Sequence, residues 1–349
     1  MIMRNTSNYK GVYTYLCVDD FLSRFLDVQA MKSAFETGLI DILSDRKNVS
    51  VEAMSRMLGI DRQALEILVG LLAHNKVVSR RSNQVALTGS FKKALMFRDL
   101  MEARIEFSNY IAPDLLDNFT VWLREPDAFI ENSRIFDLFN YHLCNDMTDE
   151  NISRTRKWMK YTTTLTRYET PVCIHHHDFS NCVSMLDIGG NSGEFAYQVC
   201  SINSLVKATV LDLPVVCEIG RRYIGGLPRG ERLDFYAADI MTDELPRGNN
   251  LVTFKSFLHD WPEGAVEKIL TKAENCLSSG GEVLIFERSK PAYFNKFPVY
   301  ANLPLFLFIR YYRNPDYYKN VLEKLGFRSI KIKKIQLEMP FMLVSAIKK

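Results

Sequence analysis

A glycine-rich turn between residues 187 and 193 is the first part of the sequence that could bind a ligand. It follows an apolar run at 183–187 that predicts a buried strand, and a helical pattern begins directly after it. Glycine lets a backbone approach a ligand closely and adopt positive φ, and Asn191 tolerates the same left-handed conformation. The spacing is not Gly-x-Gly-x-x-Gly, and no Gly-Lys-Ser/Thr follows, which excludes a phosphate loop. Asp187 beside Gly189 would suit a ligand with a cationic amino acid group.

Two further aspartates end the next two predicted strands, Asp212 at 208–212 and Asp239 at 233–239. Ligands of open α/β sheets bind beyond the carboxyl ends of the strands, so these carboxylates and the glycine turn should share one edge. A carboxylate at Asp212 can accept both hydroxyls of a ribose, and Asp239 can accept from an exocyclic adenine amine. One aspartate at a strand end is often only a helix cap. Three at successive strand ends favour a ligand site.

His259 follows the predicted strand 251–257 and is the only histidine at a strand end of this sheet. Its ordinary pKa of about 6.5 suits proton removal near neutrality. Asp260 follows it, and Pro262 opens a helix. In one interpretation His259 is a general base. In the other, Asp260 only caps the helix and His259 has no catalytic role.

No metal site is predicted from the sequence. The run 175–177 holds three adjacent histidines, but neighbouring side chains do not converge on one point, and an exposed interdomain linker is expected there. The seven cysteines are scattered, and no pair has Cys-x-x-Cys spacing. Neither a zinc knuckle nor a disulfide framework is supported, and a reducing cytoplasm is the expected location.

Alternating strands and helices are predicted from residue 183 onward, which indicates a mostly parallel sheet covered on both faces. Helices are expected to begin near 194, 214, 262 and 314, and Gly280-Gly281 is expected to end the third. Only residues 336–340 separate the last two strands, which should therefore form an antiparallel hairpin. The seven predicted strands are 183–187, 208–212, 233–239, 251–257, 282–287, 329–335 and 341–347.

The first 95 residues predict three helices and a small ribbon, an arrangement like a winged helix. One helical stripe runs from 25 to 43, and Ser50 and Asp61 can cap the next two helices. Because the third helix lacks a basic face, a dimerisation or lid role is favoured over DNA binding. Residues 99–178 read as helical and rich in aromatic side chains, which belong either to the core or to a pocket for a flat substrate.

The composition excludes several classes of protein. The chain has 349 residues, of which 47% are hydrophobic and 24% charged, and its net charge is +3. Disordered and collagen-like classes are excluded, and two domains are expected. No apolar run approaches the roughly 20 residues that span a bilayer, and no signal peptide is recognised, so no membrane partner is expected. The balanced charge gives no sign of a nucleic-acid partner.

The motifs together resemble those of the S-adenosylmethionine-dependent small-molecule O-methyltransferases, the family of caffeate-type, acetylserotonin-type and bacterial natural-product enzymes. Residues 186–193 match its first cofactor motif, 210–214 its second and 238–240 its third. Leu-His-Asp-Trp at 258–261 is its most distinctive tetrapeptide. The resemblance implies a Rossmann-like class I methyltransferase domain at 179–349, whose seven-stranded sheet has an antiparallel last strand. A winged-helix-like dimerisation domain at 1–98 and a helical connector at 99–178 precede it.

The resemblance implies a cofactor, S-adenosyl-L-methionine, and roles for particular residues. His259 is the family's general base, and Asp260 or Glu287 would orient its imidazole. Lys255, with Ser256 after it, matches a lysine near the cofactor, and Met159 and Thr163 fall near residues that contact cofactor and substrate. The expected cofactor-binding set is Asp187, Gly189, Gly190, Gly193, Asp212, Leu213, Asp239, Ile240, Lys255, Ser256, Met159 and Thr163.

The sequence also departs from the family pattern. Arg313 fits the arginine of the family's Glu-Arg-Thr run, but Tyr312 occupies its glutamate position, so one of two glutamates that flank the histidine in some members is absent. Arg310 and the tyrosines at 311 and 312 could favour an aromatic or acidic substrate, or Arg310 could be structural.

The expected reaction is methylation of a phenolic hydroxyl of a small aromatic metabolite, within secondary-metabolite biosynthesis. Two alternatives stay open. One is C- or N-methylation, or cofactor-assisted non-methyl chemistry, on the same fold. The other is a DNA-binding regulator. The resemblance also implies a homodimer through the N-terminal domain, with its contacts expected among Tyr13, Tyr15, Leu16, Val18, Phe21 and Leu22.

Overall fold

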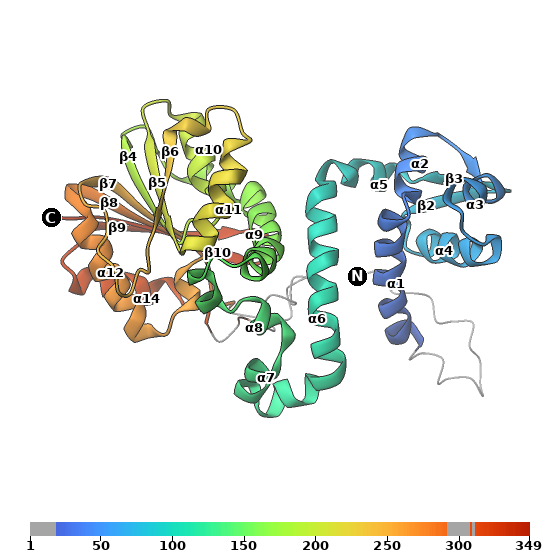
Figure 1. Ribbon diagram of the computed structural model, residues 1–349, viewed down its shortest axis with the longest axis horizontal. Coiled ribbons are helices and arrows are strands. Elements are labelled where there is room, and N and C mark those ends of the chain that lie inside the picture. The colour runs from blue at the N-terminus through green and yellow to red at the C-terminus, as the bar shows by residue number, and fades with distance from the viewer. Residues whose placement is uncertain (1–18, 292–307, 309–310) are drawn as a thin grey trace. The chain divides into compact units, whose positions relative to one another are not determined.

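The computed structural model describes residues 19–291, 308 and 311–349, with side chains from residue 26 onward. The chain divides into two compact units, residues 1–113 and 114–349. The division falls within the long helix α6 (Arg98–Arg124), at Pro113 (Figure 1). The domain boundaries at 98 and 178 stay predictions. The dimer contacts expected between Tyr13 and Leu22 lie outside the described side chains, and so does Arg310.

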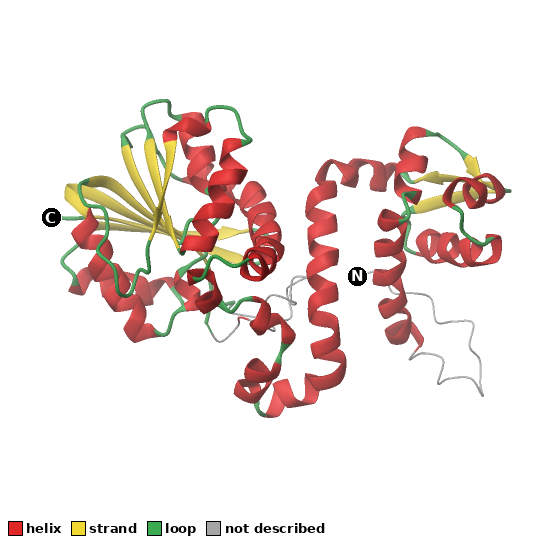
Figure 2. Cartoon of the chain, in the orientation of Figure 1, coloured by secondary structure: helices red, strands yellow, loops and turns green. Residues whose placement is uncertain are grey.

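The N-terminal unit holds helices and one small sheet (Figure 2). The sequence predicted a ribbon of two strands, to which β1 adds a third. Its three strands lie in the order β1-β3-β2, and both pairings are antiparallel. The ribbon strand expected at 76–78 begins two residues later. Its elements are α1 (Asp19–Glu36), α2 (Leu39–Asp45), β1 (Val49–Ser50), α3 (Val51–Leu58), α4 (Arg62–His74), β2 (Val78–Arg81), β3 (Gln84–Leu87), α5 (Gly89–Ala94) and η2 (Leu95–Phe97).

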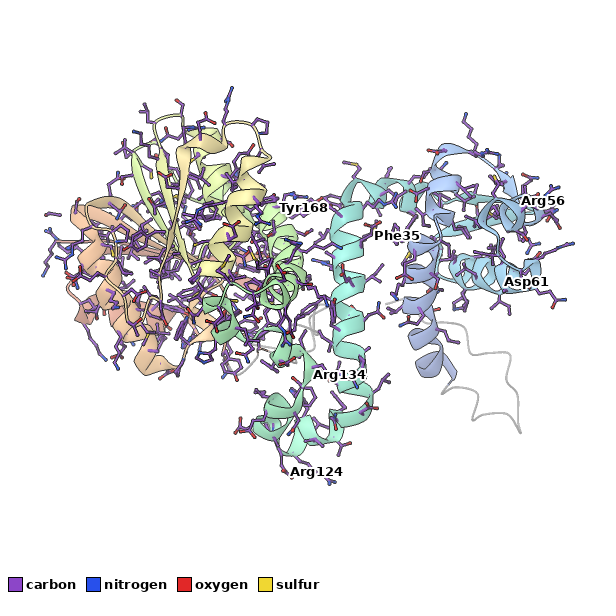
Figure 3. All side chains as sticks on the ribbon, in the orientation of Figure 1. Phe35, Arg56, Asp61, Arg124, Arg134 and Tyr168 are labelled. Carbon is purple, nitrogen blue, oxygen red and sulfur yellow. The ribbon has the colours of Figure 1, made fainter. Side chains whose placement is uncertain are left out.

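Helix ends in this unit follow local capping chemistry. Ser50 Oγ accepts the N–H of Ala53 at the start of α3, and Asp61, labelled in Figure 3, accepts that of Ala64 at the start of α4. The single helix expected over 25–43 is wrong, because Gly38 adopts φ 79° and divides it into α1 and α2. A left-handed residue satisfies the end of one helix and turns the chain into the next.

The C-terminal unit is a seven-stranded sheet with helices on both faces. The strand order is β6-β5-β4-β7-β8-β10-β9. The elements before the sheet are α7 (Pro126–Asn132), α8 (Arg134–Leu138), η3 (Tyr141–Asn145) and α9 (Asp149–His176). Those of the sheet region are β4 (Ser184–Ile188), α10 (Glu194–Ile202), β5 (Lys207–Asp212), α11 (Pro214–Gly225), η4 (Gly230–Arg232), β6 (Leu233–Ala237), β7 (Asn249–Lys255), η5 (Leu258–Asp260), α12 (Glu263–Cys276), β8 (Leu277–Arg288), α14 (Pro315–Lys324), β9 (Arg328–Gln336) and β10 (Pro340–Ile347).

The strand directions confirm the predicted sheet. β4 pairs in parallel with both β5 and β7, whereas β10 runs antiparallel to β8 and β9. The chain starts in the middle of the sheet at β4, builds outward through β5 and β6, and then crosses to β7. The strand order therefore reverses beside β4, which is where doubly wound sheets bind ligands.

Alternation along the strands sorts side chains between two cores. On β4, Met185 packs in the cluster that includes residues of α9 and α10, and Leu186 packs in the cluster that includes residues of α12 and α14. On β8, Phe286 belongs to the first cluster and Ile285 to the second. Figure 1 shows the two groups of helices against opposite faces of the sheet. Both faces are thus closed, and only strand ends and loops remain for chemistry.

Two expectations about this unit are wrong. Helix α12 ends at Cys276, and Gly280, with φ 75°, lies inside β8, so the Gly280-Gly281 pair does not end the helix. The three histidines do not form a linker, since His175 and His176 occupy the last turn of α9. Among the residues that the structure describes, no helix is long and apolar enough to span a bilayer.

Candidate active site

Asp187 lies fully buried near the carboxyl end of β4. Its Oδ1 accepts the hydroxyl of Thr253 at 2.6 Å, while its buried Oδ2 has no hydrogen-bond partner in the described part of the chain. Burial raises the pKa of Asp187 to about 7, and the nearby Asp212 carboxylate adds to this rise. A buried carboxylate with one unsatisfied oxygen is a place where a ligand's hydrogen-bond donors would be stabilised.

The glycine-rich turn after β4 has little room for side chains. Gly189 and Gly193 adopt φ 66° and 80°, and Asn191 adopts φ 56°, as its predicted left-handed role requires. A Cβ at Gly189 would lie 2.0 Å from Cδ2 of Phe257, and one at Gly190 would lie 2.6 Å from Asp187 Oδ2. Side chains at these positions would therefore displace the groups around the turn.

Asp212 ends β5 and fixes the glycine turn from the neighbouring strand. Its Oδ2 accepts the N–H of Asn191 and its Oδ1 accepts that of Leu213, both at 2.8 Å. Burial raises the pKa of Asp212 to about 6. Each carboxylate oxygen has a further lone pair, so the group can accept additional donors, such as hydroxyls.

Asp239 and Ile240 follow β6 at the next strand end. Asp239 Oδ1 accepts the N–H of Met241 at 2.8 Å, so this aspartate closes a local turn. A local structural role of this kind was the alternative to ligand binding for an aspartate at a strand end. Ile240 is buried in the core cluster under α12. The structure thus brings the third motif to the same edge as Asp212, whose carbonyl accepts the N–H of Ala238 at 3.0 Å.

Helix α9 lies over the glycine turn. The hydroxyl of Thr163 donates to Ser192 Oγ at 2.8 Å, and Asn191 Nδ2 donates to Thr162 Oγ1 at 3.1 Å. Met159 is buried beside Val215 and Val216 of α11. Thr163 therefore anchors the turn, and Met159 packs the helix against the element that follows Asp212.

Lys255 and Ser256 end β7 in a buried ionic cluster. Lys255 Nζ lies 2.5 Å from Glu169 Oε2 and donates to Thr166 Oγ1 at 2.9 Å. Arg288 pairs with the other oxygen of Glu169 and donates to Ser256 Oγ at 3.1 Å. Ser256 itself has φ 51°. The cluster ties α9 to the ends of two neighbouring strands.

His259 sits in the short turn η5 and is bound to Glu287, which is fully buried near the end of β8. Glu287 Oε1 accepts the backbone N–H groups of Phe257 and Leu258 at 2.5 and 2.7 Å, and its Oε2 lies 2.8 Å from His259 Nδ1. A carboxylate can only accept hydrogen bonds, so with Glu287 as a carboxylate His259 Nδ1 is the donor. The lone pair of the neutral imidazole is then on Nε2.

Asp260 lies on the other side of the imidazole. Its Oδ1 is 3.5 Å from His259 Nε2, beyond a short hydrogen bond, and its Oδ2 accepts the hydroxyl of Tyr141 at 3.1 Å. Burial lowers the pKa of His259, but the charges of Glu287 and Asp260 outweigh it, and the pKa is raised above its ordinary value. Of the two carboxylates expected to orient the base, Glu287 is the one that hydrogen-bonds to it.

Aromatic rings pack around His259. Tyr312 and Phe308 have ring centroids 5.4 and 6.0 Å from the imidazole. Phe139 contacts Phe308 at 6.1 Å, and the set continues through Trp158 at 5.9 Å. We call these residues the aromatic wall; its members are Phe136, Phe139, Tyr141, Trp158, Phe308 and Tyr312. Tyr312, which was expected to influence substrate choice, belongs to this wall, whereas Arg310 lies outside the described residues.

Sequence reasoning missed Thr253, Glu169 and Arg288. Thr253 lies on the same face of β7 as Leu251 and Lys255. A polar residue within this otherwise apolar strand was a signal that could have identified it. Arg288 directly follows Glu287, and a cation at the end of a predicted buried strand was a signal that it has a charged partner. Glu169 gave no signal, since it lies in a long helix with many charged residues.

Comparison with known proteins identifies the family. The model of the O-methyltransferase domain matches residues 130–328, and the chain belongs to this family. A 3-hydroxy-5-methyl-1-naphthoate 3-O-methyltransferase of Streptomyces sahachiroi is 28% identical over 273 residues, 77% of this chain and 75% of that protein. The N,N-dimethyltransferase OxyT of Streptomyces rimosus is 25% identical over 267 residues, 74% of each chain.

The fold agrees with solved structures of methyltransferases. Human N-acetylserotonin methyltransferase, solved in complex with SAM, superposes with a TM-score of 0.70 over 98% of this chain and 99% of that one, at 19% identity. The chain is therefore an S-adenosylmethionine-dependent methyltransferase with a class I fold.

Proposed function

We propose that this enzyme transfers a methyl group from S-adenosylmethionine to a phenolic hydroxyl of a small aromatic metabolite, with His259 as general base. One observation carries the proposal. His259 Nδ1 lies 2.8 Å from the buried Glu287, and the imidazole, whose Nε2 is left to accept a proton, packs against the aromatic wall. An imidazole fixed in this tautomer is prepared to accept a proton there.

The residues at the glycine turn suit the cofactor. Asp187 Oδ2, which has no partner among the described residues, can accept a hydrogen bond from the ammonium group of the cofactor. Asp212 can accept hydrogen bonds from the ribose hydroxyls. Gly189, Gly190 and Gly193 leave the backbone open to close approach. Leu213, Asp239 and Ile240 would lie along the adenosine, and Met159, Thr163, Lys255 and Ser256 support the turn and its helix. When bound, S-adenosylmethionine supplies an activated methyl group on a positively charged sulfur.

The remaining chemistry belongs to the protein. His259 Nε2 accepts the proton of the acceptor hydroxyl, and Glu287 stabilises the resulting imidazolium through Nδ1. Asp260, 3.5 Å from Nε2, adds a second negative charge beside the protonated ring. The largest contribution comes from alignment, because holding the hydroxyl in line with an activated methyl removes most of the entropic barrier.

The aromatic wall supports a flat, largely apolar acceptor. Its rings come from α8 and the residue that follows it, from η3 and α9, and from positions 308 and 312. Four of them are partly exposed: Phe136, Phe139, Tyr141 and Phe308. Neighbouring rings of the wall pack mostly edge to face, with centroids 5.6 to 6.4 Å apart, an arrangement to which a planar ring system could be added. The related naphthoate 3-O-methyltransferase has a name that states such an acceptor.

The replacement His259→Ala tests the proposal. With an accepted phenol, kcat should fall by about 10²–10⁴-fold, the range for loss of a general base. Affinity for S-adenosylhomocysteine, measured by calorimetry, should stay the same, because His259 does not lie in the glycine turn. Histidine 142, exposed in η3, supplies the control replacement His142→Ala, which should leave both quantities unchanged. Unchanged turnover in His259→Ala would refute the base assignment.

Methylation of nitrogen is the second candidate, because one relative is named as an N,N-dimethyltransferase. Product formed with a deuteriomethyl cofactor separates the candidates. Fragmentation that places the label on oxygen supports the first proposal, a label on nitrogen supports the second, and a label on carbon contradicts both.

We further propose that the N-terminal unit forms a homodimer. This unit has its own buried core and no residue in the site described above. Sedimentation should give a species of twice the 40.3 kDa chain mass, and a clean monomer would contradict the proposal.

A further inference from the structure

Arg313 holds the backbone of the turn that carries His259. Its Nη1 donates to the carbonyl of Leu258 at 3.0 Å, and its Nη2 donates to the carbonyl of Trp261. These two carbonyls flank the pair His259-Asp260. The guanidinium also lies 5.2 Å from the ring centroid of Tyr317, which fixes its plane. A planar, forked donor can hold two carbonyls at once, which an ammonium cannot do with the same geometry.

The anchor of Arg313 is the same strand that supplies Glu287. Arg313 forms a parallel bridge with Ser289, directly after β8, and its carbonyl accepts the N–H of Lys290 at 3.1 Å. Glu287 accepts the N–H groups of Phe257 and Leu258 at the start of the turn. The N–H groups of the turn are therefore bound by the carboxylate of Glu287 near the end of β8. The carbonyls of the turn are bound by the guanidinium of Arg313, which is paired with the residue after β8.

We propose that Arg313 is a positioning residue for His259, which sets the direction of Nε2 by fixing the backbone on both sides of the imidazole. The inference rests on the proposed function of His259. Arg313 does not contact the reacting atoms, so its effect reaches the reaction only through the base. Its neighbour Tyr312 packs against the imidazole at 5.4 Å, so the same segment holds both the ring and its backbone.

A double-replacement cycle tests the inference. Arg313→Ala should lower kcat by about 10–100-fold with little change in the KM for the cofactor, and Arg313→Lys should recover part of the loss. In a His259→Ala background, Arg313→Lys and Arg313→Ala should each change kcat by less than about twofold, because the base through which they act is gone. Circular dichroism and thermal melting are recorded for every variant.

Arg221 provides a matched control. It also donates to a backbone carbonyl, that of Phe235 at 2.9 Å, and lies over an aromatic ring, but on the surface of α11. Arg221→Lys should leave kcat unchanged in both backgrounds. If Arg313→Lys lowers kcat equally with and without His259, Arg313 does not act through the base and the inference is overturned. If His259→Ala itself leaves kcat unchanged, the proposed function fails instead.

Discussion

The glycine turn and the η5 turn lie at neighbouring strand ends but are built in opposite ways. The glycine turn contains Asp187, whose buried Oδ2 has no hydrogen-bond partner among the described residues and whose pKa is raised to about 7. Around η5, Glu287 accepts three donors and Arg313 binds two carbonyls. The free carboxylate oxygen of the first region would be satisfied by donors from a ligand, whereas the carboxylate of the second region already has its donors within the protein. Cofactor binding and base positioning should therefore respond differently to replacement.

Glu287→Gln should give the largest effect and act on catalysis alone. An amide cannot accept two backbone N–H groups and the His259 Nδ1–H while keeping its own N–H groups satisfied. We expect kcat to fall on the order of 10²–10⁴-fold, the range for loss of general-base catalysis, because the imidazole loses the group that orients it. Loss of the negative charge should lower the raised pKa of His259, so the acid limb of the kcat/KM profile moves to lower pH.

Glu282→Gln is the control on the same strand. Glu282 lies 3.5 Å from His177 Nε2, far from η5 in the strand, so it is also a carboxylate beside a histidine. The rate and the pH profile should stay the same. An equal fall in both variants would show that any loss of charge on β8 disturbs the enzyme, which would remove the special role of Glu287.

Gly189→Ala should show that the two turns are physically joined. The new Cβ would meet the ring of Phe257 at 2.0 Å, and position 189 has a φ of 66° that alanine adopts with strain. Affinity for S-adenosylhomocysteine should fall on the order of 100-fold by calorimetry. Gly264→Ala, in α12 with open space around its Cα, should leave affinity unchanged. Equal affinity in Gly189→Ala would mean that the turn adapts.

The pKa of Asp187 predicts a pH dependence of cofactor binding. The carboxyl group must ionise to accept a cationic amino group, so affinity should fall about fourfold from pH 8 to pH 6.5 for a pKa near 7. Asp187→Asn should bind weakly at both pH values and lose this dependence. Since the folded pKa lies above 3.8, the free energy of unfolding of the ligand-free enzyme should fall as pH rises from about 4 to above 7, and this decline should shrink in Asp187→Asn. A pH-independent affinity in the unmodified enzyme would contradict the assignment.

Tyr141→Phe should give the smallest effect. It removes one hydrogen bond to Asp260 Oδ2 and leaves the contacts of Glu287 intact. The loss of a single neutral donor predicts about a threefold fall in kcat, with unchanged cofactor affinity. Steady-state kinetics check this, and a loss as large as that of Glu287→Gln would place Asp260, rather than Glu287, as the main partner of the base.

Much of the fold was predictable from the sequence, because strand ends, helix caps and glycine turns are local signals. Ser50 and Asp61 cap the helices that they were expected to cap, and the final hairpin is antiparallel. The break at Gly38 was missed because the apolar stripe continues across it, and the stripe carries no information about φ. The end of α12 at Cys276 was missed because glycines are common both after helices and inside irregular strands.

The candidate site was predictable in its residue types but not in its connections. Asp187, Asp212 and His259 follow from their positions at strand ends. The choice between Glu287 and Asp260 as partner of His259 Nδ1 depends on pairing between β7 and β8, which local sequence does not encode. Glu169 reaches Lys255 from 86 positions earlier in the chain, and only the packing of α9 against the sheet brings them together.

The register of β8 carries a consequence for engineering. Glu287 points to one face of the sheet and Arg288 to the other, where it meets Glu169. Deleting one amino acid between 282 and 287 would bring Arg288 to the place of Glu287 and send a guanidinium toward the imidazole. Inserting one would bring Glu287 to the place of Arg288 and set a carboxylate beside Glu169. Chimaeras built to accept new metabolites should therefore be joined outside this strand, with its length left untouched.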